Sequence, residues 1–202
     1  LLEHHNPATM GTLNAAGKFQ AAFFQSVTTR TAGFASVSQS GLTNGSKLLA
    51  SMLMIIGGSP AGTAGGIKTT TVAVLLLTAI SVLRGNKDTE CYGRKITFEI
   101  IRVGITITLV TFVFWLFGVT VMTVIEPQQK VLDLMFEATS AMATVGLTAD
   151  LTPVLSDISH VVLMLMMYIG RIGPMTMALI FSGHVDKKNQ FRTLPEAKIM
   201  VG

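Results

Sequence analysis

Charged residues are scarce in this sequence. Asp, Glu, Lys and Arg make up only 13% of the 202 residues, whereas hydrophobic residues make up half, and the mean hydropathy is +0.58. A soluble domain usually carries about 25% charged residues, so the composition excludes a charged, water-exposed surface over most of the chain. It predicts helices that lie in a lipid bilayer, each of which needs roughly 20 apolar residues.

Cysteine and catalytic groupings are also nearly absent. The single Cys91 excludes a disulfide framework within the chain. Serine, histidine and aspartate are scattered over separate loops, and no paired carboxylates share a predicted helical face. The sequence therefore predicts a protein that is not an enzyme and that uses no cofactor.

The net charge of +4 does not come from a basic surface of the kind that binds nucleic acid. The basic residues gather in two segments, Arg84–Lys95 and the C-terminal tail from 183 onward, and acidic residues prevail in the segments between the apolar runs and the pore loops described below. This asymmetry is the positive-inside pattern of membrane proteins. It predicts a multi-pass protein of the plasma membrane with both basic segments in the cytoplasm and no nucleic-acid partner.

Two short apolar runs, at 19–29 and 131–142, each lead into a Thr-x-Gly sequence. Each run is too short to cross a bilayer as a helix. A half-membrane helix that ends at a glycine is typical of a re-entrant pore loop, because glycine lets successive backbone carbonyls point in one direction, where they replace the water around a potassium ion. The alternative is an ordinary buried turn after a surface helix. The carbonyls predicted to bind potassium are those of Thr31, Ala32, Gly33, Thr144, Val145 and Gly146.

The two runs belong to an internal repeat. Gly33 and Gly146 are 113 positions apart, and so are Gly57 and Gly170. Self-similarity at a fixed period indicates repeated structural units. We therefore expect two pore-loop units, at 1–95 and 96–202.

The stretch from Leu48 to Leu83 is apolar except for a glycine-rich interruption. An unbroken helix over this stretch would be about 54 Å long, against about 30 Å for the hydrocarbon core. Non-helical backbone at membrane depth is tolerated only inside protein or beside water, so we expect this loop to lie in the pore as a gate. The predicted gating residues are Gly57, Gly58, Ser59, Pro60, Ala61, Gly62, Thr63, Ala64, Gly65 and Gly66, together with Arg171.

Two other interpretations of the glycine-rich segment are weaker. A phosphate-binding loop requires Gly-Lys, but here Ile67 separates Gly66 from Lys68. The spacing of Gly62 and Gly66 also fits a helix-packing motif. That alternative requires a regular helix, which Pro60 disfavours.

Further spans are predicted at 96–125 and 154–181. Arg171 lies in the second of these, near mid-membrane, where charged residues are costly and usually face the protein interior. We expect its guanidinium to bond carbonyls of the glycine loop and to hold the loop closed. Glu137, in the second pore helix, is expected to hydrogen-bond behind the filter.

Four sequences carry a resemblance to a known family: Gln25–Phe34, Gly57–Thr69, Ala143–Leu147 and Gly170–Pro174. Together they resemble the Trk/Ktr/HKT superfamily of cation transporters, most closely the membrane subunits of Ktr potassium transporters, over nearly the whole chain. The resemblance implies an all-α membrane protein of repeated helix–pore loop–helix units around a potassium-channel-like pore. Members carry four such repeats, of which this sequence resembles the last two.

The resemblance also implies a function and partners. These are potassium uptake, a homodimer, a cytoplasmic nucleotide-binding regulatory subunit, and a missing N-terminal half that supplies the other two filter segments. It links an arginine at the place of Arg171 to gating. One alternative is a sodium-selective or sodium-coupled member, which in this superfamily tends to have serine in place of a filter glycine. A non-conducting membrane scaffold is the other, although the glycines of both visible filters are intact.

Overall fold

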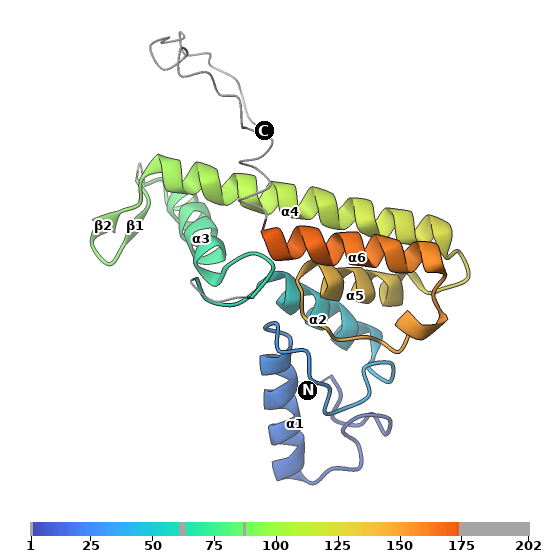
Figure 1. Cartoon of the computed structure of the whole chain (residues 1–202). Coiled ribbons are helices and arrows are strands. Elements are labelled where there is room, and N and C mark those ends of the chain that lie inside the picture. The colour runs from blue at the N-terminus through green and yellow to red at the C-terminus, as the bar shows by residue number, and fades with distance from the viewer. Residues whose placement is uncertain (1, 61–63, 87, 174–202) are drawn as a thin grey trace.

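The structure is a computed structural model that describes residues 2–60, 64–86 and 88–173. Over these residues the chain is mostly helical (Figure 1). The elements are α1 (Ala15–Thr28), α2 (Asn44–Ile55), α3 (Thr69–Leu83), β1 (Glu90–Cys91), β2 (Arg94–Lys95), α4 (Phe98–Ile125), α5 (Val131–Met142), the 3-10 turn η1 (Thr152–Val154) and α6 (Asp157–Ile172).

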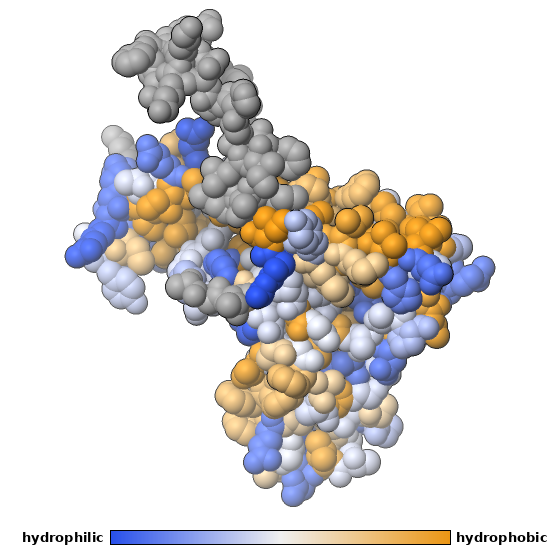
Figure 2. Space-filling model, in the orientation of Figure 1, coloured by the Kyte–Doolittle hydropathy of each residue, from blue (hydrophilic) through white to orange (hydrophobic). Residues whose placement is uncertain are grey.

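Helix α4 is the longest element, and its position agrees with the predicted span. Its 28 residues extend about 42 Å at 1.5 Å per residue. Among the described residues it is the one helix long and apolar enough to cross a membrane; α3 is apolar but shorter. Apolar side chains cover the outer surfaces of α4 and α6, whereas polar ones cover the β1–β2 hairpin (Figure 2).

Helix α5 lies at the centre, packed against α2, α4 and α6 (Figure 1). From Leu134 to Met142 every residue except Met135 is buried. A helix that is enclosed on several sides is apolar or small around most of its circumference, and alanine, threonine and serine at 138–141 allow neighbouring helices to approach closely. The core includes Val119, Met122, Leu134, Ala138, Leu163 and Met166.

Helix α1 is far less covered. It lies to one side of the helices around α5 and runs across their direction (Figure 1). Thr28 is its one buried residue, and Phe19 and Phe23 are 74% and 66% exposed. Within the described residues, α1 therefore presents an apolar face.

Three expectations need correction. The first pore helix begins at Ala15 rather than 19, because the Asn14 side chain caps the Gly17 N–H. The last span is not one helix over 154–181, because α6 ends at Ile172 and Gly173 takes a φ of 87°. The Arg84–Lys95 loop contains an antiparallel hairpin, so the fold is not purely helical. The predicted tail from 183 lies outside the described residues.

Candidate filter and gating loop

The two Thr-x-Gly segments, far apart in the sequence, lie against each other. A Cβ added to Gly33 would collide with the carbonyl oxygen of Val145, and a Cβ added to Gly146 would lie 3.9 Å from the Cα of Gly33. Both glycines have positive φ, 76° and 91°, a conformation that glycine adopts without steric cost. The fold therefore brings the two predicted filter segments together at one place.

The threonines of the two segments share an unusual backbone. Thr31 and Thr144 have φ of 66° and 54°, although a β-branched residue rarely adopts positive φ. Sequence reasoning missed this feature, since it assigned unusual backbone only to the glycines. Such strained residues persist where the surrounding structure fixes them, and they cluster at functional sites.

Backbone N–H groups of the two segments point back toward their pore helices. Gly33 donates to the Thr28 carbonyl at 3.3 Å, and Val145 donates to the Ser140 carbonyl at 2.9 Å. Within the part of the chain that the structure describes, no hydrogen bond is donated to the six predicted filter carbonyls. Those oxygens are thus left for another partner, as a cation site requires.

Glu137 is hydrogen-bonded to the chain that follows the second predicted filter segment. The side chain is 4% exposed. Its carboxylate accepts hydrogen bonds from the Thr148 hydroxyl at 2.6 Å, the Ala149 N–H at 2.9 Å and the Thr152 hydroxyl at 3.0 Å. The segment after Gly146 is therefore tied to the pore helix before it.

The first filter segment has different supports. The Thr28 hydroxyl accepts from the Phe34 N–H at 2.8 Å and donates to the Phe34 carbonyl at 2.6 Å. Behind it, the side-chain amides of Gln25 and Gln39 hydrogen-bond to each other. Gln39 is 113 positions before Thr152, so equivalent positions of the two repeats bond different side chains, Gln25 in the first and Glu137 in the second.

A glutamate fastens the start of the helix that follows each filter. Glu3 Oε1 accepts from the Thr43 N–H at 2.9 Å, and Glu126 Oε1 accepts from the Ser156 N–H at 2.7 Å. Thr43 and Ser156 are the N-caps of α2 and α6 and are 113 positions apart. Sequence reasoning overlooked both glutamates, although the matching cap residues were a signal that the repeat offset could have revealed.

The two carboxylates, which lie outside the spanning segments, ionise easily. Burial on its own raises the pKa of Glu3, but hydrogen bonds from Ser46, Thr43 and Thr9 outweigh it and lower the pKa to about 2. The Ser156 N–H and hydroxyl lower the pKa of Glu126 in the same direction. Hydrogen bonds to the charged form account for both changes.

The glycine-rich loop is closed at its stem. Ile56 and Ile67 form a β-bridge, where the Gly57 N–H donates to the Ile67 carbonyl at 2.8 Å and the Ile67 N–H donates to Ile55 at 2.9 Å. Gly66 has a φ of 70°, so the helix-packing interpretation is wrong at that residue. Ala61, Gly62 and Thr63 lie outside the described residues.

The loop touches the second filter segment directly. The Gly65 N–H donates to the Thr144 hydroxyl at 3.1 Å, and a Cβ on Gly65 would lie 2.7 Å from the Ala143 carbonyl oxygen. Lys68 donates to the Ala64 carbonyl at 2.5 Å. The predicted gating loop and one predicted filter segment thus form a continuous structure.

Arg171 lies in the last turn of α6, next to Gly170. A Cβ on Gly170 would collide with the Met142 carbonyl at the end of α5, so α6 packs tightly against α5 just before the arginine. The Arg171 side chain is exposed in this chain. The predicted latch joins Arg171 to the glycine-rich loop, and residues 61–63 of that loop lie outside the described residues.

Comparison with known proteins gives one family. The TrkH family of cation transport proteins matches residues 1–192. The chain is 37% identical over 202 residues to Ktr system potassium uptake protein B of Bacillus subtilis, covering 100% of the chain and 44% of that protein. It is 38% identical to the protein of the same name from Vibrio alginolyticus (90% and 40% covered), and 36% identical to Potassium/sodium uptake protein NtpJ of Enterococcus hirae (89% and 41% covered).

The chain thus spans less than half the length of these relatives. The family match, the sparse charge and the apolar helices agree with one another and place the protein in a membrane. The chain belongs to the TrkH family of cation transport proteins, whose members are transporters and not enzymes.

Proposed function

We propose that this chain supplies two of the four segments of a potassium-conducting pore. The observation that carries the proposal is the meeting of Gly33 with Val145 and Gly146, with matching left-handed backbone in both segments. The filter oxygens are the backbone carbonyls of Thr31, Ala32, Gly33, Thr144, Val145 and Gly146. The other two segments come from chain outside these residues.

Helix orientation supports a cation at this place. Helices α1 and α5 end at Thr28 and Met142, a few residues before the filter glycines. The C-terminus of a helix carries about half a negative charge. Two such ends near the filter favour a cation and disfavour an anion.

The loop beneath the filter acts as the gate in this proposal. Gly65 contacts the second filter at Thr144, and the stem at Ile56 and Ile67 fixes the loop to the end of α2. The gate comprises Gly57, Gly58, Ser59, Pro60, Ala61, Gly62, Thr63, Ala64, Gly65 and Gly66, with Arg171 as the group that holds it closed.

The proposed units, membrane orientation and partners of the chain are those that its family membership suggests. The two pore-loop units are 1–95 and 96–202, and the Arg84–Lys95 loop and the tail face the cytoplasm. The relatives named as Ktr system proteins support a membrane component of a multi-subunit system, so we propose a homodimer that binds a cytoplasmic nucleotide-binding regulatory subunit.

Replacing a filter glycine by serine tests the proposal. Gly33→Ser places a Cβ against the Val145 carbonyl, and Gly146→Ser places one on a backbone whose positive φ strains any side chain, so potassium selectivity over sodium should fall about tenfold, equivalent to ~1.4 kcal/mol. Potassium and sodium uptake by the full-length protein in vesicles measures this ratio. Gly93→Ser, in the β1–β2 hairpin, is the control.

Two results would reject the filter assignment. One is an unchanged ion ratio in folded Gly33→Ser and Gly146→Ser proteins. The other is that the unmodified protein takes up sodium and shows no preference for potassium. The second result would favour the sodium alternative, which the name of the Enterococcus hirae relative also brings into consideration.

A further inference from the structure

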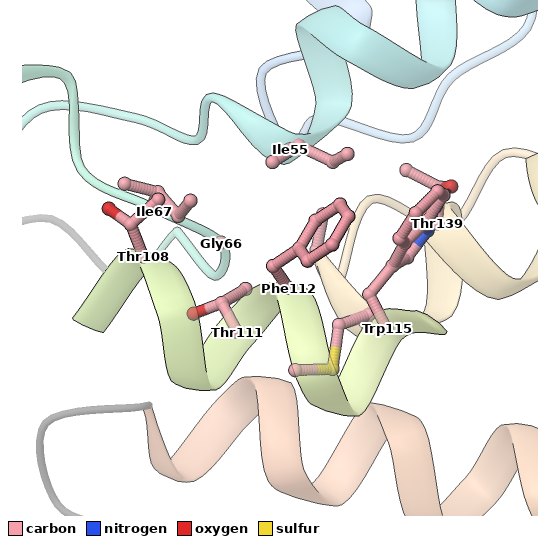
Figure 3. A pocket seen from close by; sticks show the side chains of 10 residues that line it. Ile55, Gly66, Ile67, Thr108, Thr111, Phe112, Trp115 and Thr139 are labelled. Carbon is pink, nitrogen blue, oxygen red and sulfur yellow. Dashed lines mark hydrogen bonds between the residues drawn. The ribbon is translucent and has the colours of Figure 1, made fainter. Parts of the chain in front are cut away.

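An apolar cavity of about 130 Å³ lies beside the gating loop (Figure 3). Three parts of the chain enclose it: the middle of α4, the end of α5, and the stem of the loop. Thr108, Thr111, Phe112 and Trp115 of α4 form one side, and Ile55 and Ile67 of the stem form another. The cavity therefore borders both the pore helix and the gate.

The polar groups that line the cavity are already satisfied. The hydroxyls of Thr108 and Thr111 donate to carbonyls of their own helix at 2.9 and 2.8 Å. Trp115 Nε1 donates to the Thr139 hydroxyl at 2.8 Å, and that hydroxyl donates to the Met135 carbonyl at 2.6 Å. A water molecule needs two to four polar partners, so this lining favours an apolar occupant.

The depth of the cavity identifies that occupant. Residues 108–115 lie in the middle of α4, the described helix that is long enough to cross a membrane. At that depth the surrounding material is lipid hydrocarbon. Phe112 lines the cavity and is 55% exposed, while Leu109, one turn away on the outer surface, is 61% exposed. The cavity thus adjoins the lipid-facing surface of α4.

We propose that the terminal part of one lipid acyl chain occupies this cavity. An apolar cavity of about 150 Å³ takes up benzene or xenon, so the volume here suits the last few carbons of a chain. The α4 surface beside it is apolar at Leu109, Val113 and Leu116, which gives the rest of the chain a continuous path to the bilayer.

Occupancy would act on the gate, and this part rests on the proposed function. Ile55 and Ile67 line the cavity and also hydrogen-bond to each other at 2.9 Å in the stem of the loop. A chain packed against both side chains stabilises the closed stem. The bound lipid then lowers potassium flux, without contacting the ion path itself.

Trp115 provides a direct probe, because it is the one tryptophan of these 202 residues. The full-length protein, with tryptophans outside these residues replaced by phenylalanine, is reconstituted in phosphatidylcholine with bromine at the acyl-chain ends. We expect strong quenching of Trp115 emission, and weaker quenching when the bromine is placed near the headgroup. Thr111→Phe fills the cavity and should reduce quenching about threefold.

A matched control lies on the same helix. Val124→Phe adds a ring on the exposed surface of α4 away from the cavity and should leave quenching unchanged. If Thr111→Phe does not fold, Thr111→Leu gives a smaller reduction in the same direction. Undiminished quenching in a folded Thr111 variant, or equal quenching by both brominated lipids, would overturn the site.

Flux measurements separate this site from the proposed function. Thr111→Phe mimics the occupied cavity, so its potassium flux should equal or fall below that of wild type in any lipid. Raised potassium flux in Thr111→Phe would overturn the coupling to the gate. So would a Thr111→Phe protein with reduced quenching whose potassium flux still depends on the lipid as in wild type. The quenching result does not depend on potassium transport.

Discussion

Helices α1 and α5, which we propose as pore helices, differ in how much of the chain surrounds them. Helix α5 is enclosed by α2, α4 and α6, and nearly all of it from Leu134 onward is buried. In α1, only Thr28 is buried. Helix α4 precedes α5 in the chain and packs against it, whereas no described helix precedes α1 and packs against it. Among the described residues, α5 is therefore held by several neighbouring helices, whereas α1 is not.

The two segments that we propose as filter segments also differ in burial. Val145 and Leu147 are buried, whereas Phe34, which corresponds to Leu147, is 70% exposed. Yet Thr31 and Thr144 both have positive φ, as do Gly33 and Gly146. The two segments thus share left-handed backbone at matching positions, although the chain around them covers the second segment more fully than the first.

The largest expected effect tests this difference in enclosure. Phe136→Ala, at 0% exposure in α5, should destabilise the protein by about 3–5 kcal/mol, since it leaves a cavity in a packed core. Phe23→Ala, at 66% exposure in α1, should lower the stability of this chain much less. Thermal unfolding in detergent compares the two. Equal losses would contradict the idea that α1 is held more loosely.

A second test concerns an ion pair that joins the two predicted units. Lys47 of α2 and Asp133 of α5 lie 2.6 Å apart, with side chains 8% and 20% exposed. His160 is the counterpart of Lys47 and contacts the Thr152 carbonyl instead. Asp133→Asn leaves a buried ammonium unpaired, which should cost about 3 kcal/mol, the lower end of the range for such pairs.

The control for this test is a charged pair at the surface. Asp88 and Lys95 in the hairpin region also lie 2.6 Å apart, but their side chains are about half exposed. Asp88→Asn should cost less than about 1 kcal/mol. If the two aspartate variants unfold at the same temperature, burial is not what makes the Lys47 pair important.

A smaller effect, dependent on pH, is expected at Glu3. Because its pKa is lowered to about 2 in the folded protein, the ionised form adds stability above the unfolded pKa of about 4.3. That stability is lost as pH falls from about 4.3 toward 2. Glu3→Gln should therefore cost about 1–3 kcal/mol at pH 7, and its stability should approach that of wild type in acid. A pH-independent difference would rule out this role.

The smallest change is expected at the gate. Arg171→Ala should raise potassium flux a few-fold, worth less than about 1.4 kcal/mol, with selectivity unchanged, because the latch is lost while the filter stays intact. Deletion of Ser59–Gly65 should also raise potassium flux. Potassium uptake into vesicles measures the effect of each variant. Arg84→Ala, outside the gate, is the control. Wild-type or lower flux in folded Arg171→Ala would reject the latch.

Much of this arrangement follows from sequence periodicity. The 113-residue repeat and the apolar runs predicted α4 and α5 within two residues at each end, as well as the helix break after Ile55. They did not predict the left-handed Thr31 and Thr144, because threonine itself disfavours that backbone. Nor did they predict contacts between residues far apart, such as Gly65 with Thr144, since these depend on how the helices pack.

The hydrogen bond between Gly65 and the Thr144 hydroxyl has a thermodynamic consequence. If ion binding at Val145 shifts the position of Thr144, then loop opening and ion affinity are linked, and each must change the other by the same factor. A regulator that opens the loop then also alters how tightly the filter holds its ion. Because Gly65 bonds Thr144 of the second predicted filter segment, in the proposed pore this linkage acts on that segment.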